Sequence, residues 1–214
     1  MKTFFKCILF VLCYVQGYAS QLNVVKGWNL FSPVISTEVD VVTYLGNDVL
    51  SALSKIWVFD QTDSRWKKFV PNATTQGFTK FKPSQGYWIK MDSAKTINLS
   101  DSVSRFSISL NGSGWKLTGT SSSTQRVLDD TDFFKPSNIT TGAKSNLTKI
   151  WGYDPTGAGW QKHVPDATNN QLLSLRPGFG YWFKLGGSLS IDGGGVDLNS
   201  LFPPVCPGCP GFNN

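Results

Sequence analysis

The chain has 214 residues, with 20 Lys and Arg against 14 Asp and Glu, and a formal net charge of +6. This excess is mild and the basic residues are scattered along the chain, which argues against the concentrated basic surface of a nucleic-acid-binding domain. Charged residues make up only 16% of the chain while Trp, Phe, Gly, Ser and Thr are abundant, a composition that favours extracellular β-proteins over helical ones.

Residues 1–19 have the layout of a secretory signal peptide, with Lys2 and Lys6 at the start, an apolar stretch over residues 8–15 and a small-residue exit at Ala19. The apolar stretch is much shorter than the ~20 residues that a membrane-spanning helix needs, and no later stretch is longer. We therefore expect a mature chain that is secreted or located at the cell surface, without a membrane-spanning segment.

A repeated pattern covers most of the remaining chain. KIWVFD at residues 55–60 returns as KIWGYD at residues 149–154, and KPSQGYWIKM at residues 82–91 returns as RPGFGYWFKL at residues 176–185. Both pairs are 94 positions apart, whereas GWNL at residues 27–30 and GWKL at residues 114–117 are 87 apart. Each copy holds four of the eight tryptophans. The pattern predicts two homologous repeats, over residues 20–103 and 104–192.

The order of these motifs resembles tandem modules of predicted secreted and cell-surface proteins, mostly bacterial. Their pattern runs Gly-Trp-Asn-Leu, Ile-Trp-x-aromatic-Asp, Trp-x-x-x-x-Pro and Pro-Gly-x-Gly-Tyr-Trp, and it covers nearly all of residues 24–191. Ser84 stands where the pattern prefers Gly, and Lys116 stands where it prefers Asn. The resemblance implies an extracellular location and a tandem architecture more than an activity.

Residues 55–60 and 65–70 predict a β-hairpin with Phe59 opposite Trp66, and the second copy predicts the same hairpin. One face would carry Trp57, Phe59, Trp66 and Lys68, and the other Ile56, Val58, Lys67 and Phe69. In the second copy the first face stays aromatic, whereas the other becomes Ile150, Gly152, Gln161 and His163. We therefore expect the aromatic face to form the core.

Residues 86–90 predict a further strand, entered through a Pro-x-x-Gly turn in which the last glycine takes a positive φ. Gly27 and Gly114 are expected to serve the opening strands similarly. Residues 38–53 space Val39, Val42, Leu45, Val49 and Leu53 at helical intervals, so a short helix is expected there, and a loop in the second copy. The fold class is mainly β, with two antiparallel β-rich repeats, sandwich or barrel-like, and at most short helices.

Residues 193–214 form a Gly/Pro/Cys tail. Cys7 and Cys13 leave with the signal peptide, so the mature chain keeps Cys206 and Cys209. In an oxidising compartment this pair favours a local disulfide, with an interchain link as the alternative. A zinc site would need two more ligands, and a thioredoxin-type role would need the pair at a helix start.

Groups that perform catalysis are scarce. Beyond residue 19 the chain has one histidine, His163, and one glutamate, Glu38. Asp60 and Asp154 stand where a strand meets a turn, which favours capping of backbone NH groups. Asp129, Asp130 and Asp132 lack the alternating ligands and glycine of a calcium loop. We therefore predict no catalytic residue, no metal and no cofactor, and keep a hydrolase using His163 or Glu38 as a minor hypothesis.

The tryptophans suit either two equivalent cores or a surface on which sugar rings stack. Strand alternation groups Trp88 with Lys90 and Trp182 with Lys184, and leaves Tyr87, Ile89, Tyr181 and Phe183 on the opposite, apolar face. The first four are the candidate binding residues. Five Asn-x-Ser/Thr motifs are candidate glycosylation sites, at Asn72, Asn98, Asn111, Asn138 and Asn146.

These features predict a non-enzymatic, secreted or surface-associated module that acts in adhesion or extracellular structural assembly. Its expected partner is an extracellular protein or a glycan, or a second copy of the chain, and not a nucleic acid. The alternative is a carbohydrate-binding module that uses exposed Trp and Tyr.

Overall fold

The computed structural model describes residues 21–99, 106–128, 133–134 and 138–193. The fold is mainly β, as predicted, and every strand pair is antiparallel. All sheets in these ranges are open ladders, so the sandwich-like alternative holds and the barrel-like one does not. The expected signal peptide, the Cys206–Cys209 pair, the Asp129 to Asp132 cluster and the tail beyond Gly193 lie outside the described residues.

The first half, residues 21–99, contains three sheets and one helix. Its elements are β1 (Gln21–Val24), β2 (Gly27–Phe31), β3 (Val39–Asp40), α1 (Val41–Leu50), β4 (Leu53–Asp60), β5 (Arg65–Phe69), β6 (Lys80–Phe81), β7 (Tyr87–Met91) and β8 (Lys95–Asn98). The main sheet has the order β2-β7-β4-β5, while β1 pairs with β8 and β3 pairs with β6.

The second half, residues 106–193, also contains three sheets, and its main sheet has four strands like that of the first half. Its elements are β9 (Phe106–Leu110), β10 (Gly114–Gly119), β11 (Arg126–Val127), β12 (Ile139–Thr141), the 3-10 helix η2 (Lys144–Asn146), β13 (Leu147–Asp154), β14 (Gly159–His163), β15 (Ser174–Leu175), β16 (Gly180–Leu185) and β17 (Leu189–Gly193). The main sheet has the order β10-β16-β13-β14, β11 pairs with β15, and β12 extends the β17-β9 pair.

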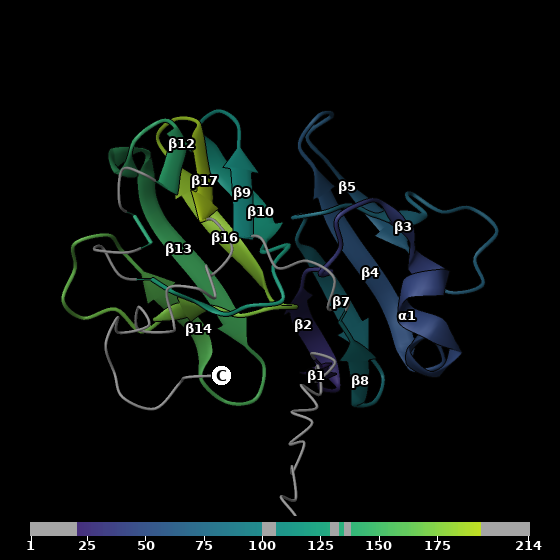
Figure 1. Cartoon of the computed structure of the whole chain (residues 1–214). Coiled ribbons are helices and arrows are strands. Elements are labelled where there is room, and N and C mark those ends of the chain that lie inside the picture. Colours follow the sequence, from purple (N-terminus) through teal and green to yellow (C-terminus); the bar gives the residue numbers. More distant parts are fainter. Residues whose placement is uncertain (1–20, 100–105, 129–132, 135–137, 194–214) are drawn as a thin grey trace, which may run out of the picture.

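The two main sheets agree in register as well as in strand order. Phe59 lies opposite Trp66, as predicted, and Tyr153 lies opposite Trp160 at the positions 94 residues later. Figure 1 shows the halves side by side, with β2 of the first half next to the second half. This agreement is compatible with a duplicated unit, although the common origin of the halves stays a prediction.

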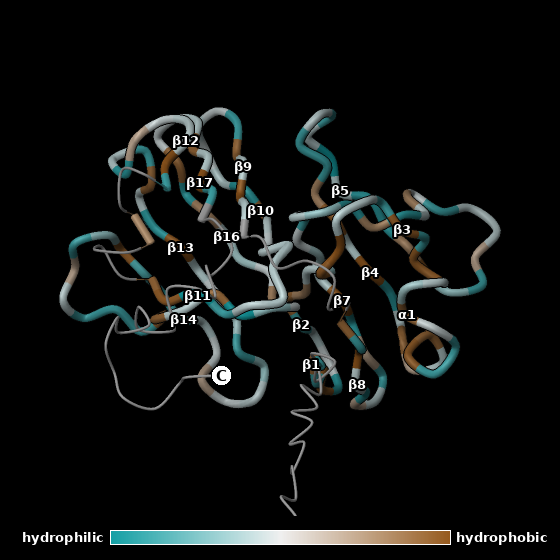
Figure 2. Tube along the Cα trace, viewed as in Figure 1, coloured by the Kyte–Doolittle hydropathy of each residue, from teal (hydrophilic) through white to brown (hydrophobic). Residues whose placement is uncertain are grey.

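In the hairpin of each half, the buried core lies on the face opposite to the aromatic face that the sequence analysis expected to form it. Ile56 and Val58 of β4 and Phe69 of β5 are buried, whereas Trp57 is half-buried and Trp66 is 45% exposed. The prediction of an aromatic core was therefore wrong. The strands and helix α1 hold most of the hydrophobic residues, and the long outer loops are mostly hydrophilic (Figure 2).

The second half shows why small and polar residues misled that prediction. A Cβ atom on Gly152 would lie 3.1 Å from Leu172 Cδ1 and 3.2 Å from the Tyr181 ring, so these two side chains already fill the space. His163 is only 3% exposed, its ring stacks on Phe134 at 6.0 Å, and its Nδ1 lies 3.3 Å from the Leu172 carbonyl oxygen. Gly152 and His163 are therefore core residues.

Helix α1 confirms the short helix expected over residues 38–53. The Asp40 carboxylate caps it by accepting hydrogen bonds from the backbone NH groups of Val42 and Thr43, at 2.9 and 3.1 Å. Its buried stripe is Val41, Leu45 and Val49, whereas Val42, predicted to be part of the stripe, is 47% exposed.

No helix within the described ranges has the length and apolar character to cross a membrane.

In the Pro-x-x-Gly turns, the residue with a positive φ angle comes earlier in the chain than predicted. Positive φ angles occur at Ser84 (56°) and Gly178 (81°), two residues before the predicted Gly86 and Gly180. The expectation for the opening strands is confirmed, since φ is 99° at Gly27 and 94° at Gly114.

Each turn is closed by the tyrosine of its Gly-Tyr-Trp motif. The Tyr87 hydroxyl accepts a hydrogen bond from the Lys82 backbone NH at 2.8 Å, and the Tyr181 hydroxyl accepts one from the Arg176 NH at 2.6 Å. Burial raises the pKa of both phenols, that of Tyr181 to about 12. Both tyrosines are therefore fixed, neutral core residues.

The two turns also hold the halves together, in what we call the reciprocal clasp. The turn of the second half meets β2, where the Ser32 NH donates to the Gly178 carbonyl oxygen at 2.9 Å. The turn of the first half meets β10, where the Gly119 NH donates to the Ser84 carbonyl oxygen at 3.2 Å. Isolated β-bridges join Phe31 to Phe179 and Gln85 to Thr118. Each contact thus has a counterpart with the halves exchanged.

Gly86 and Gly180 are needed in the clasp because the opposite half comes so close. A Cβ atom on Gly86 would lie 2.8 Å from Leu117 Cδ1, and one on Gly180 would lie 2.9 Å from the Phe31 carbonyl oxygen. Both distances are shorter than ordinary contacts. The repeated Gly-Tyr-Trp motif therefore marks a site of contact between the halves.

Candidate functional site: an aromatic cleft between the halves

All eight tryptophans lie on the faces of the two main sheets that point away from the cores. The set, with two further rings, is Trp28, Trp57, Phe59, Trp66 and Trp88 in the first half and Trp115, Trp151, Tyr153, Trp160 and Trp182 in the second. Rings from opposite halves approach each other, with centroids of Trp66 and Trp182 at 6.3 Å and of Trp88 and Trp160 at 5.8 Å. We call the space that these ten residues line the aromatic cleft.

The aromatic cleft contains two cavities, of about 640 Å³ and about 840 Å³. The smaller is lined by Trp28, Trp57, Trp66, Trp88, Tyr153 and Trp160, and the larger by Phe59, Trp66, Trp115, Trp151, Trp160 and Trp182. Each residue that lines the smaller cavity has its counterpart, at the corresponding position of the other half, in the lining of the larger cavity. The chain therefore presents two cavities of matched composition, and Trp66 and Trp160 line both.

The rings of the cleft are too exposed to be a sealed interior. Trp28, Trp66, Trp115 and Trp160 are between 38% and 45% exposed, and the other four indoles are half-buried. Contacts between rings are mostly edge-to-face or tilted, for example 87° between Trp28 and Trp88. Such a surface offers flat apolar faces against which a ligand with its own flat apolar face can stack.

Six lysines share the strand faces that carry the cleft tryptophans: Lys55, Lys68 and Lys90, and at the corresponding positions Lys149, Lys162 and Lys184. Lys90 lies directly opposite Lys55, and Lys184 lies directly opposite Lys149. Like charges directly opposite each other in a sheet are destabilising. The same unfavourable arrangement thus occurs in both halves.

Of the four predicted binding residues, the two tryptophans line this cleft and the two lysines lie beside it on the same strand faces. Trp88 lines the smaller cavity and Trp182 the larger. The Lys90 Nζ lies 5.9 Å from the centroid of the Trp28 ring, and the Lys184 Nζ lies 5.6 Å from that of Trp115. Sequence reasoning did not single out the remaining six tryptophans, although Trp66 and Trp160 share a strand face with Lys68 and Lys162 in the same way.

The predicted glycosylation asparagines differ in accessibility. Asn72, Asn98 and Asn111 are exposed, whereas Asn138 and Asn146 are half-buried. The Asn146 Nδ2 donates a hydrogen bond to the Ser188 carbonyl oxygen at 2.8 Å. A glycan at Asn146 would have to break this contact, so the three exposed sites are the better acceptors.

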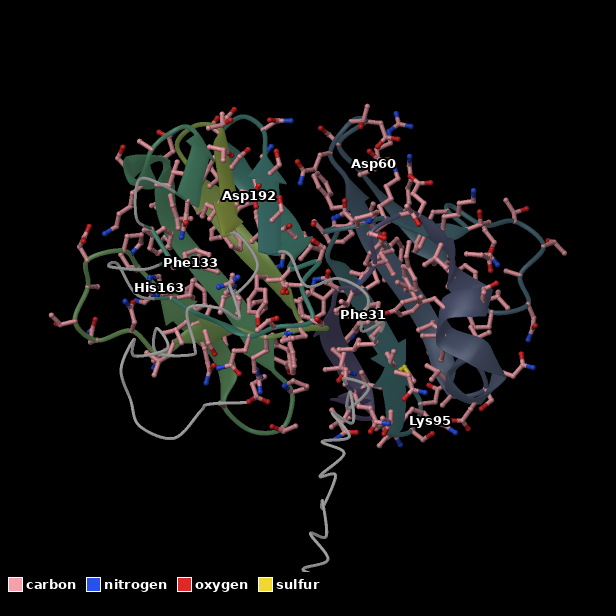
Figure 3. The ribbon with its side chains drawn as sticks, in the orientation of Figure 1. Phe31, Asp60, Lys95, Phe133, His163 and Asp192 are labelled. Atoms are coloured by element: carbon pink, nitrogen blue, oxygen red, sulfur yellow. The ribbon has the colours of Figure 1, made fainter. Side chains whose placement is uncertain are left out.

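The residues considered for hydrolysis lie apart from each other and from the cleft. His163 is in the core of the second half, stacked on Phe134, and Glu38 is exposed in the first half. Figure 3 shows His163 among the side chains of the second half. The structure therefore assembles no acid–base pair from His163 and Glu38.

Asp60 and Asp154 cap their turns, as predicted. Each carboxylate accepts a hydrogen bond at 2.9 Å from the backbone NH two residues later, that of Thr62 or Thr156. The Lys67 ammonium, 2.6 Å away, together with the Thr62 NH, lowers the pKa of Asp60 to about 2. The Thr156 hydroxyl and NH lower the pKa of Asp154.

Comparison with known proteins adds no relative, because the chain matches no protein-family model, no curated protein and no solved structure. The resemblance to tandem secreted modules therefore stays a prediction. Any function has to be argued from the aromatic cleft itself.

Proposed function

We propose that the chain is a non-enzymatic, secreted or surface-associated binding module that acts in adhesion or extracellular assembly through the aromatic cleft. One observation carries the proposal: all eight tryptophans are placed off the two cores and gathered between the halves, with four of them at least 38% exposed. An exposed apolar patch of this kind marks a binding surface in a soluble protein.

Within this proposal the ligand is a carbohydrate. The favouring observation is that both cavities are lined only by aromatic rings, while lysines on the same strand faces border them. The flat face of a pyranose stacks on an indole, and its hydroxyls bond to polar groups at the edge of the site. A protein partner remains the alternative occupant of the same surface.

Binding of the purified mature chain to a glycan array, followed by titration with tryptophan fluorescence, tests both statements. We expect saturable binding that Trp88→Ala and Trp182→Ala each weaken at least tenfold. Leu173→Ala is the matched control, because Leu173 is 63% exposed and lies outside the cleft. Thermal unfolding of each variant verifies that the fold is intact.

A mature chain that binds no glycan, no cell surface and no matrix protein, and that stays monomeric, would refute the proposed function. Binding to a protein ligand that Trp88→Ala and Trp182→Ala weaken would keep the binding module and reject the carbohydrate.

A further inference from the structure

The six lysines that border the aromatic cleft have no acidic partner among the described residues. The ion pairs in the described part of the chain use other lysines, namely Lys67, Lys95 and Lys144. Neither cavity is lined by Asp or Glu. The cleft therefore combines aromatic faces with positive charge that the described part of the chain does not neutralise.

In each half, two of these lysines lie next to each other and beside a tryptophan of the cleft. In the first half Lys90 has Trp28 as its cross-strand neighbour on one side and Lys55 on the other, and in the second half Lys184 stands between Trp115 and Lys149. Each half thus places two lysines opposite each other on neighbouring strands, beside an indole. A second charge of the same sign opposite the first destabilises the sheet, and an anion bound between them would remove that repulsion.

The lysine ammonium groups also lie within reach of a group attached to a stacked ring. The Nζ of Lys68 is 5.8 Å from the centroid of the Trp57 ring, and those of Lys90 and Lys184 are 5.9 and 5.6 Å from the rings of Trp28 and Trp115. A sugar ring that stacks on these indoles would bring a carboxylate or sulfate substituent close to an ammonium group, where a charge-assisted hydrogen bond forms.

This combination selects among ligand classes. A quaternary ammonium ligand, which aromatic cages bind, would be repelled by the lysine pairs. A small inorganic anion would leave the indoles unused, and a neutral glycan would leave the lysines unneutralised. Building on the proposed function, we infer that the aromatic cleft binds an acidic polysaccharide, whose sugar rings stack on the tryptophans while their carboxylate or sulfate groups contact the paired lysines.

Isothermal titration calorimetry on the full mature chain tests the inference with four probes: polygalacturonate for carboxylate, dextran sulfate for sulfate, neutral dextran, and an oligothymidylate for single-stranded nucleic acid. We expect one of the acidic polysaccharides to bind at least tenfold more tightly than dextran and the oligothymidylate. Its affinity should fall with added salt, as expected for contacts between opposite charges.

Lys90→Gln/Lys184→Gln is the decisive variant, and Lys26→Gln/Lys80→Gln is its control, because it removes the same charge from exposed positions outside the cleft. The first variant should weaken binding of the acidic polysaccharide at least tenfold and leave its melting temperature unchanged or higher, since it removes one charge from each like-charged pair. The control should change affinity less than threefold.

The outcomes separate this inference from the proposed function. Equal affinity for dextran and the acidic polymers, or an acidic ligand insensitive to Lys90→Gln/Lys184→Gln, would overturn the inference and leave a carbohydrate-binding cleft. Tighter binding of the oligothymidylate would overturn it in favour of a nucleic-acid ligand. Binding of none of the probes overturns it too, and the array experiment then decides the proposed function.

Discussion

In the first half, a capped helix covers the inner face of the main sheet through Val41, Leu45 and Val49. In the second half, most of the residues that correspond to this helix lie outside the described part of the chain. The described Phe133 and Phe134 belong to the buried cluster there, and Phe134 stacks on His163 of β14. Strand order and register are nevertheless the same in both main sheets. The same sheet and aromatic face therefore occur over cores of different composition.

The largest expected effect comes from emptying the matched core position in each half. Ile56 and Ile150 are fully buried at corresponding places in β4 and β13. Ile56→Ala and Ile150→Ala should each lower the free energy of unfolding by about 2–5 kcal/mol, through lost burial and a cavity. Urea unfolding followed by circular dichroism measures this.

The same experiment shows whether the halves are coupled. Because the reciprocal clasp joins them, we expect one unfolding transition that either variant shifts. Two transitions, each responding only to the variant in its own half, would show that the halves unfold separately and that the clasp contributes little.

A smaller effect is expected where the halves meet at corresponding positions. Ser32 and Gly119 are counterparts 87 residues apart, and a Cβ atom on Gly119 would lie 2.0 Å from the Ser32 Cβ. Only one of the two positions therefore has room for a side chain. Gly119→Ser should lower the free energy of unfolding by about 1–3 kcal/mol through overpacking.

Exchanging the two residues provides the control. Ser32→Gly/Gly119→Ser moves the single side chain to the other half and should recover most of the loss in thermal unfolding. Equal stability of Gly119→Ser and the wild type would show that this contact is not tight.

Among the described residues, a side chain caps an α-helix in the first half only. Asp40→Ala removes the side chain that accepts the Val42 and Thr43 NH groups and should lower the free energy of unfolding by about 0.5–2 kcal/mol. Val127, the counterpart of Asp40, lies in β11 and is 59% exposed, so Val127→Ala should change the free energy of unfolding by less than about 0.5 kcal/mol. Urea titrations of both variants compare the halves directly, and similar losses would contradict the capping role.

The smallest effect concerns the two turn carboxylates at acid pH. Because the pKa of Asp60 is lowered from 3.8 to about 2, its contribution to stability is complete above about pH 4 and is lost as the pH falls toward 2. Asp60→Asn should therefore make the decline of the melting temperature between pH 4 and pH 2 shallower.

Added salt should affect the acid sensitivity of the two turn carboxylates differently. The Asp60 shift arises first from the Lys67 ammonium, whereas the Asp154 shift arises first from the uncharged Thr156 hydroxyl. Added salt should reduce the acid sensitivity due to Asp60 more than that due to Asp154. Melting curves of Asp60→Asn and Asp154→Asn at low and high salt test this, and an equal salt effect would reject the distinction.

Much of the fold could be predicted from the sequence because local patterns determine it. The hairpin register, the apolar face of Tyr87 and Ile89, the short helix and the turn-capping role of Asp60 all follow from residues close together in the chain. The core face could not be predicted in this way. Gly152 is buried by Leu172 and Tyr181, about 20–30 positions away, and His163 by Phe134.

The candidate site was only partly accessible from the sequence, for a related reason. Alternation within a strand grouped Trp88 with Lys90, but no local pattern shows that the same face of a second sheet lies opposite. That placement depends on the reciprocal clasp, which needs glycine at residues 86 and 180 for close approach rather than for a positive φ.

Trp66 and Trp160 each form part of the wall of both cavities. A rotation of either indole would change the shape of both chambers. If a ligand fills both, occupation of the first would change the free energy of binding in the second, and a titration should deviate from the curve for two identical, independent sites. The sign of that deviation would reveal whether the shared walls move together or against each other.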